Sequence, residues 1–444
     1  MLAEVPVSRK RKKKRSGGSG RSPARSLLDV QHRGGDGELA RAFQNLAAYR
    51  DQTDRSRTSR AATMAAGLVS NLTRAVIERP DLVVTDALCE RLGALLSDDR
   101  DAPIDVHVDP GRLAEATLAA AEAAVKAALP NDEQTDTWRA PWRVLAALTA
   151  VLPYPHADAV EETIARLRAL PAGNVLPAAP RCPEVTGPVL WTSDRYGSRF
   201  AVTAPITAAE EAAETRRWYL WDVDACGHGA FTVHSGFYPS SAAALADWQA
   251  AVGPTASAGT ELAPPEDPSL LSELLPAELG FMRIGGENAA QFAEYHRSKR
   301  FAEAVTRALP RANARRDVGL TPAAAAAEFS AWLRTHGLAK PPEGLDELVA
   351  ELAESWTVND VDALYPACSP HRVALCVLHL RNYYLDDFAE QLVALLPDWV
   401  RWLADRNATA PELADRCLPY AHGQPHPQLG DDDTKVEYLA RVAE

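Results

Sequence analysis

One segment of this chain, residues 189–252, has a hydrophobic period close to two, whereas the segments on either side have a helical period. Within it, residues 200–206 place a larger apolar side chain at every second position. Residues 216–225 are apolar on both alternating faces. Alternation of this kind is typical of a β-strand, and a strand with two apolar faces is covered on both sides. The segment therefore predicts a sheet whose central strand is 216–225.

Two further strands and a helix complete this segment. Residues 189–191 precede a turn at 194–197 that ends in Gly197, a residue that adopts turn conformations without steric cost. Residues 231–233 predict a fourth strand, and a helix follows Ser240, with Leu245 and Trp248 on one face. The sequence thus predicts a four-stranded antiparallel sheet with one helix packed on it.

Helical patterns dominate the rest of the chain. Apolar residues recur at helical spacing between residues 61 and 76, and Pro397 predicts the start of another helix. The Pro-rich segment 171–188 and the segment 253–268 are typical of linkers. The fold class expected is mainly α, with two helical regions flanking a small four-stranded antiparallel β-sheet plus helix lobe. The predicted organisation is a disordered basic tail (1–35), an N-terminal helical region (36–170), a linker (171–188), the β lobe (189–252), a linker (253–268), a C-terminal helical region (269–420) and a polar tail (421–444).

Composition limits the class and the compartment. The chain has 444 residues, of which 46% are hydrophobic and 24% charged, as in ordinary globular proteins. No apolar run approaches the length of a membrane helix, and no apolar core follows the basic N-terminal segment, so we expect neither a membrane partner nor a secretory signal. Six cysteines scattered over so long a chain predict free thiols in a reducing cytoplasm rather than a disulfide framework.

Charge divides the chain unevenly. Residues 1–33 carry ten basic and two acidic side chains, net +8, whereas the remainder carries 37 basic and 58 acidic side chains, net −21. Seven basic residues are consecutive, namely Arg9, Lys10, Arg11, Lys12, Lys13, Lys14 and Arg15. Such an arm is typical of nucleic-acid binding. The alternatives are a solubilising tail or a tail that folds back on the acidic body.

Two carboxylates near the end of the central strand are the best catalytic candidates. Asp222 and Asp224 are two residues apart, so their side chains share one face of the strand, and His228 and His234 follow closely. Paired carboxylates with histidine suit a divalent metal or general acid–base chemistry. The alternative, which we favour, is that the carboxylates bind amides of the turn that begins at Asp224.

A zinc site within residues 368–379 is excluded by helix geometry. Cys368, His371, Cys376 and His379 form two Cys-x-x-His pairs. If His371 and His379 lie on one helix, they are about 12 Å apart along its axis. Tetrahedral zinc requires ligand atoms within about 2.0–2.3 Å of the metal. We therefore expect no metal and no cofactor from this motif.

The predicted sheet is rich in aromatic side chains. They are Trp218, Tyr219, Trp221, Phe231, Phe237 and Tyr238. Exposed beside Arg195, Arg199, Arg216 and Arg217, they would form a platform for stacking bases. In a sheet this small we expect them to form the core instead.

These patterns favour a non-catalytic interaction or adaptor protein rather than an enzyme. Its basic arm would engage nucleic acid or another polyanion, and a protein partner is also expected. The alternative function is a metal-dependent hydrolase or nuclease centred on Asp222 and Asp224. The sequence contains no Gly-rich phosphate loop, no nucleophile elbow and no zinc-protease motif.

Overall fold

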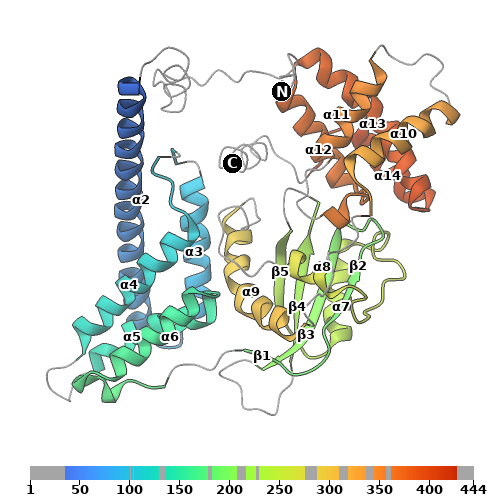
Figure 1. Ribbon diagram of the computed structural model, residues 1–444. Coiled ribbons are helices and arrows are strands. Elements are labelled where there is room, and N and C mark those ends of the chain that lie inside the picture. The colour runs from blue at the N-terminus through green and yellow to red at the C-terminus, as the bar shows by residue number, and fades with distance from the viewer. Residues whose placement is uncertain are drawn as a thin grey trace. The chain divides into compact units, whose positions relative to one another are not determined.

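The computed structural model describes residues 36–100, 102–103, 105–129, 136–178, 183–207, 217–226, 230–275, 288–309, 319–336, 344–356 and 362–427. The basic arm therefore lies outside the described residues, as does most of the polar tail. The described chain forms two compact units, one within residues 36–178 and the other within 183–427 (Figure 1). Each unit has its own architecture.

The N-terminal unit is entirely helical in its described part. Its helices are α2 (Asp36–Glu78), α3 (Val84–Arg100), α4 (Pro110–Ala128), α5 (Arg139–Val151) and α6 (His156–Arg168), with two 3-10 turns, η1 (Asp136–Trp138) and η2 (Pro171–Val175). The predicted apolar stripe of α2 is buried at Ala61, Ala65, Leu68, Leu72 and Val76. This spacing puts one face of α2 against α4 and α5.

The burial of side chains changes along helix α2. From Ala61 onward one face is buried, but residues 44–60 have no buried side chain. This first part is polar on every side, since its sequence runs NLAAYRDQTDRSRTSR. A helix that is polar all round does not owe its position to a core. Its first half is therefore a surface element that extends from the packed half.

The sheet of the second unit has the order β1-β3-β4-β5, with β2 also paired to β3. Its strands are β1 (Glu184–Val185), β2 (Leu190–Ser193), β3 (Arg199–Thr207), β4 (Arg217–Asp224) and β5 (Phe231–Tyr238), and all pairs are antiparallel. The two apolar faces of β4 place it between β3 and β5, as its pattern predicted.

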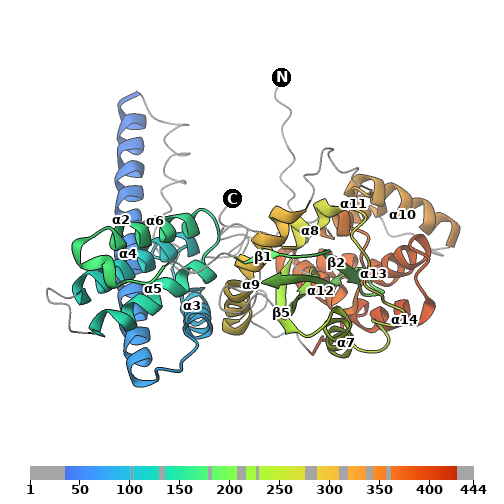
Figure 2. The ribbon, with the colours of Figure 1, turned by 90° about the horizontal axis from the view of Figure 1, so that it is seen from below.

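Helices cover both faces of the sheet (Figure 2). On one face, α7 (Ser241–Val252) packs Ala244 and Trp248 against Ala201 and Leu220. On the other, α8 (Pro268–Leu274) and α9 (Ala289–Ala308) pack against the strands, with Trp221 in a larger cluster. The helix after the strands is capped by Ser240, whose Oγ accepts a hydrogen bond from the Ala243 amide.

The remaining described helices form a second core within this unit. They are α10 (Pro322–His336), α11 (Leu345–Ser355), α12 (Pro370–Tyr383), α13 (Asp386–Arg406) and α14 (Pro411–Ala421), with the 3-10 turn η4 (Asp362–Leu364). Trp356, Trp399 and Phe329 are fully buried at its centre.

The end of the sheet meets the start of α12. The Cys368 amide donates to the Tyr196 carbonyl of the β2–β3 turn at 3.4 Å. Cys226 Sγ, just after β4, lies 3.2 Å from Ser369 Oγ. Ser369 also caps α12, and Pro370 follows at the first helical position. This junction brings side chains from distant parts of the sequence together.

The predicted mainly α fold class is confirmed, with two differences in detail. The sheet has a fifth strand, β1, because residues 184–185 of the predicted linker pair with the end of β3. Helix α13 runs through Pro397 instead of restarting there. Leu392, Leu396 and Trp399 are buried on one continuous face, and this packing outweighs the hydrogen bond that proline removes. The domain boundaries expected from composition stay predictions.

Candidate functional site

Asp222 is held by a buried ion pair. Its carboxylate is 2% exposed, and it accepts hydrogen bonds from Arg199 Nε at 2.8 Å and Nη2 at 2.6 Å. In the strand register Ala201, not Arg199, lies opposite Asp222. The Arg199 guanidinium therefore extends along β3 to reach Asp222 diagonally. Burial raises the pKa of Asp222, and the Arg199 guanidinium opposes that rise. Both carboxylate oxygens of Asp222 are therefore engaged by one side chain.

Asp194 closes the turn between β2 and β3. Its Oδ1 accepts hydrogen bonds from the Ser198 amide at 2.8 Å and the Arg199 amide at 3.2 Å. Burial raises the pKa of Asp194 to about 6, against the effect of those amides. Gly197 supplies the positive φ of 69° that the turn needs. Asp194 therefore has a structural role at the same end of the sheet.

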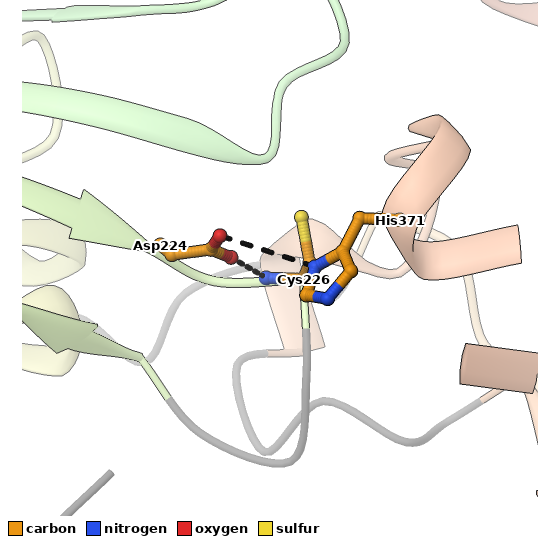
Figure 3. A group of neighbouring side chains, drawn as sticks. All are labelled: Asp224, Cys226 and His371. Carbon is orange, nitrogen blue, oxygen red and sulfur yellow. Dashed lines mark hydrogen bonds and ion pairs between the residues drawn. The ribbon is translucent and has the colours of Figure 1, made fainter. Parts of the chain in front are cut away.

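Asp224 has one oxygen bonded within its own turn and one directed toward helix α12 (Figure 3). Its Oδ1 accepts a hydrogen bond from the Cys226 amide at 2.8 Å, as the turn-binding alternative predicted. Its Oδ2 lies 4.0 Å from His371 Nδ1, too far for a hydrogen bond. Asp224 thus differs from Asp222 in having a carboxylate oxygen directed at a second functional side chain.

Cys226 and His371 complete a three-residue cluster with Asp224. One ligand-type atom from each residue lies within 4.8 Å of the other two. Cys226 is 3% exposed, and burial raises the pKa of its thiol well above the usual value. Both ring nitrogens of His371 are buried, and neither has a hydrogen-bond partner among the described residues. In the described part of the chain this is the group whose geometry suits a metal ion.

The two other candidate histidines do not join this group. His234 is exposed on β5, and its Nε2 lies 3.2 Å from the Tyr238 hydroxyl. That hydroxyl donates to Asp247 on α7. His234 is the cross-strand neighbour of Asp222, but the contact of its ring nitrogen is with Tyr238 of its own strand. His228 lies outside the described residues.

The two Cys-x-x-His pairs do not converge. Cys376 is buried in the core of the C-terminal helices, and His379 stacks on Tyr383. Both lie with His371 on the single helix α12, as the geometric argument required. His371 faces the sheet end instead. The sequence analysis did not bring His371 together with Asp224 and Cys226.

The strand aromatics divide between core and surface. Tyr219 and Trp221 are buried, and Tyr219 contacts Phe237 and Phe301 edge-on or tilted. Arg217 lies over the Phe237 ring, with 4.9 Å between its guanidinium carbon and the ring centroid. These contacts are typical of a packed sheet face rather than of an open stacking platform. Arg216, one of the four arginines expected beside such a platform, lies outside the described residues.

Arginines on the first half of α2 are exposed. Arg50 and Arg55 project from the part of the helix without buried side chains. An open pocket lies there, lined by polar residues of α2 and by one residue of the α3–α4 connection. Its lining includes Gln52, Arg55, Ser56, Ser59, Arg60 and Thr63 of α2, and Val106.

Comparison of the chain with protein-family models, with curated proteins and with solved structures finds no match. Among the described residues, no helix is both long and apolar enough to cross a membrane. The function must therefore be argued from the side chains themselves.

Proposed function

We propose that this protein is a polyanion-binding interaction protein, in which the basic arm and the first half of α2 form one continuous binding element. The observation that carries the proposal is that α2 has no buried side chain between residues 44 and 60: one side meets α4, where Arg112 donates to Asp54 and Thr58, and the other sides are exposed. This stretch follows the arm closely along the chain. The exposed sides of such a helix are available for a partner.

Charge along α2 supports this assignment. Between residues 55 and 74 the sequence contains four arginines and no acidic residue, although residues 34–444 together carry net −21. Arg60 is partly neutralised, because its Nε contacts Asp99 at 2.7 Å. Arg50 and Arg55 stay exposed. Lys and Arg side chains bind phosphates and release counterions, which favours nucleic acid as the polyanion.

The pocket beside these arginines has a lining suited to phosphate. Ser56 and Ser59 line it beside Arg55 and Arg60, whereas the Thr63 hydroxyl already donates to the Ser59 carbonyl at 3.0 Å. Serine and threonine hydroxyls and arginine side chains are regular donors to phosphate oxygens. Contacts of this kind position a nucleic acid without reading its sequence, so we expect sequence-independent binding.

A reducing cytoplasm is the compartment we propose. Within the described residues, Cys226, Cys368 and Cys417 are free thiols. Free thiols in this number are typical of reducing compartments. Nucleic acid is available there as a partner.

A salt titration on one random duplex tests the proposal. If the seven cations of Arg9–Arg15 and the two of Arg50 and Arg55 each neutralise one phosphate, log K falls against log salt with a slope of about −8, of which the arm contributes about −6. Deleting residues 1–33 should remove most of that slope. The pair Arg50→Ala and Arg55→Ala should reduce it by about 2. The matched control pair, Arg79→Ala and Arg91→Ala, removes two other exposed arginines of the same unit and should leave the slope unchanged.

Two outcomes would refute the proposal. No binding at low salt would exclude the polyanion role altogether. If the salt slope falls equally in the α2 variant and in its control, the arm alone is the binding element and α2 is not part of it.

A metal-dependent hydrolase or nuclease centred on Asp222 and Asp224 is the second candidate function. The free Oδ2 of Asp224 favours it, and the Arg199 pair of Asp222 disfavours it. Hydrolysis of the duplex with added magnesium or manganese, compared between the wild type and the double variant D222N/D224N, distinguishes the two functions. We expect no metal-dependent hydrolysis from either protein. Hydrolysis that disappears in a folded double variant would establish the enzyme.

A further inference from the structure

The hydrogen-bonding groups around His371 do not account for the burial of its ring nitrogens. A neutral imidazole has one donor and one acceptor nitrogen, and buried polar atoms normally have hydrogen-bond partners. Both ring nitrogens of His371 are buried without one, and its side chain is only 14% exposed. The nearest carboxylate oxygen, Asp224 Oδ2, stays 4.0 Å from Nδ1. Such a histidine is poised for a ligand that supplies the missing bond.

The neighbours of His371 are metal ligands by type. Asp224 offers its free Oδ2, because the Cys226 amide occupies only Oδ1. Cys226 offers Sγ, which lies 3.2 Å from Ser369 Oγ. The three candidate ligand atoms lie within 4.8 Å of one another. Figure 3 shows the three side chains converging from the end of β4 and from the start of α12.

The spacing of these atoms suits a tetrahedral ion. Zinc bonds of about 2.0–2.3 Å at tetrahedral angles put ligand atoms about 3.3–3.8 Å apart. The observed limit of 4.8 Å exceeds this by roughly 1 Å, a difference that small side-chain rotations close. Magnesium and calcium prefer oxygen ligands, whereas a thiolate with an imidazole selects zinc and similar ions.

We propose that Asp224, Cys226 and His371 bind one zinc ion through Oδ2, Sγ and a ring nitrogen. Binding breaks the S–H bond of Cys226, the proton passes to solvent, and the thiolate bonds to the metal without any change of oxidation state. One carboxylate and one thiolate balance the two positive charges of the ion. This site uses neither Asp222 nor the polyanion-binding arm, so it is independent of the proposed polyanion binding, and it shares only Asp224 with the alternative hydrolase function.

Zinc at this position would join two parts of the second unit. Asp224 and Cys226 belong to the end of the sheet, and His371 belongs to the first turn of α12, which packs in the C-terminal helical core. Binding to the folded state alone raises stability. A second imidazole is near the site, since the His426 ring centroid lies 5.2 Å from that of His371.

Metal titration of the tag-free, full-length protein tests this assignment after treatment with a chelator. We expect stoichiometric zinc binding by calorimetry and a rise in melting temperature on zinc addition. Cobalt(II) should give the visible bands of a tetrahedral ion and a near-ultraviolet thiolate charge-transfer band. Cys226→Ser should abolish the charge-transfer band. Asp224→Asn and His371→Asn should each weaken zinc binding by about 100-fold or more, since even indirect partners of a metal ligand contribute 10–100-fold.

Matched controls lie on the same helix. Cys376→Ser and His379→Asn remove a thiol and an imidazole of α12 that do not approach Asp224, and both variants should bind zinc like the wild type. Absence of stoichiometric zinc binding by the wild type would overturn the proposal. Undiminished binding by C226S, or equal loss in the controls, would also overturn it. Far-UV circular dichroism checks folding, and the partly exposed His371 provides the variant least dependent on core packing.

Discussion

The first half of α2 and the end of the sheet gather polar side chains in opposite ways. On α2, the charged residues are neighbours in the sequence, are exposed, and meet few partners. At the sheet end, Asp194, Asp222 and Cys226 are buried; Asp194 accepts hydrogen bonds within its own turn, whereas Asp222 and Cys226 contact Arg199 and Ser369 of other segments. Exposed charge contributes little to stability, whereas buried charge that loses its partner is costly. The two regions should therefore respond very differently to substitution.

The largest difference concerns the sheet core. Trp221→Ala should lower the free energy of unfolding by about 3–5 kcal/mol, because Trp221 is fully buried and leaves a cavity. Trp138→Ala removes the same residue type from a half-buried position in the N-terminal unit and should cost about 1 kcal/mol. Urea denaturation measures both values. Similar losses for the two variants would contradict the burial contrast.

The next difference concerns two ion pairs of similar length. Asp222→Asn leaves the half-buried Arg199 guanidinium without its buried charged partner, so we expect a loss of about 3 kcal/mol. Asp54→Asn breaks the exposed pair between α2 and Arg112, whose N–O distance is also 2.6 Å, and should cost about 0–1 kcal/mol. Equal costs would show that distance, not burial, sets the strength of these pairs.

Asp194 gives the sheet end a pH dependence that α2 lacks. Its pKa is about 6 in the folded protein and about 3.8 in the unfolded chain, so the folded state binds the proton more tightly. Its contribution is fully present below pH 4 and is lost as pH rises through 6, by about 3 kcal/mol in total. Subtracting the unfolding free energies of Asp194→Asn from those of the wild type between pH 4 and 8 isolates this change. A constant difference over that range would contradict the assignment.

The smallest effect on stability is expected from α2. Arg50→Ala with Arg55→Ala should change the free energy of unfolding by no more than about 0.5 kcal/mol, since neither side chain is buried. Removing residues 1–33 should likewise leave the melting temperature unchanged. Differential scanning calorimetry checks both. A clear loss of stability would mean that these residues pack against the body.

Local patterns predicted much of the fold. The spacing of Ala61, Leu68 and Val76 identified the buried face of α2, and the two apolar faces of residues 216–225 identified the central strand. The predicted helix start at Pro397 was wrong, because the buried face that continues past Pro397 outweighs the preference of proline for the first turn of a helix. Strand β1 was missed because a two-residue strand has no period to detect.

The candidate site was predictable only in part. The Asp224 turn contact followed from its own sequence, since carboxylates at strand ends bind nearby amides. Arg199 as the partner of Asp222 required the strand register, which the sequence did not specify. His371 required the approach of α12 to the sheet end. An aspartate and a cysteine two residues apart after a strand were the only local indication of a metal site.

The central claim is that the arm and the exposed half of α2 bind polyanions while the buried sheet end does not. Hydrogen exchange of the full-length protein, with and without a random duplex at low salt, tests it most directly. The account predicts slower exchange in residues 44–60 on duplex addition and unchanged exchange in residues 217–226 and in α12. Protection of the sheet end and α12, with none in residues 44–60, would contradict it.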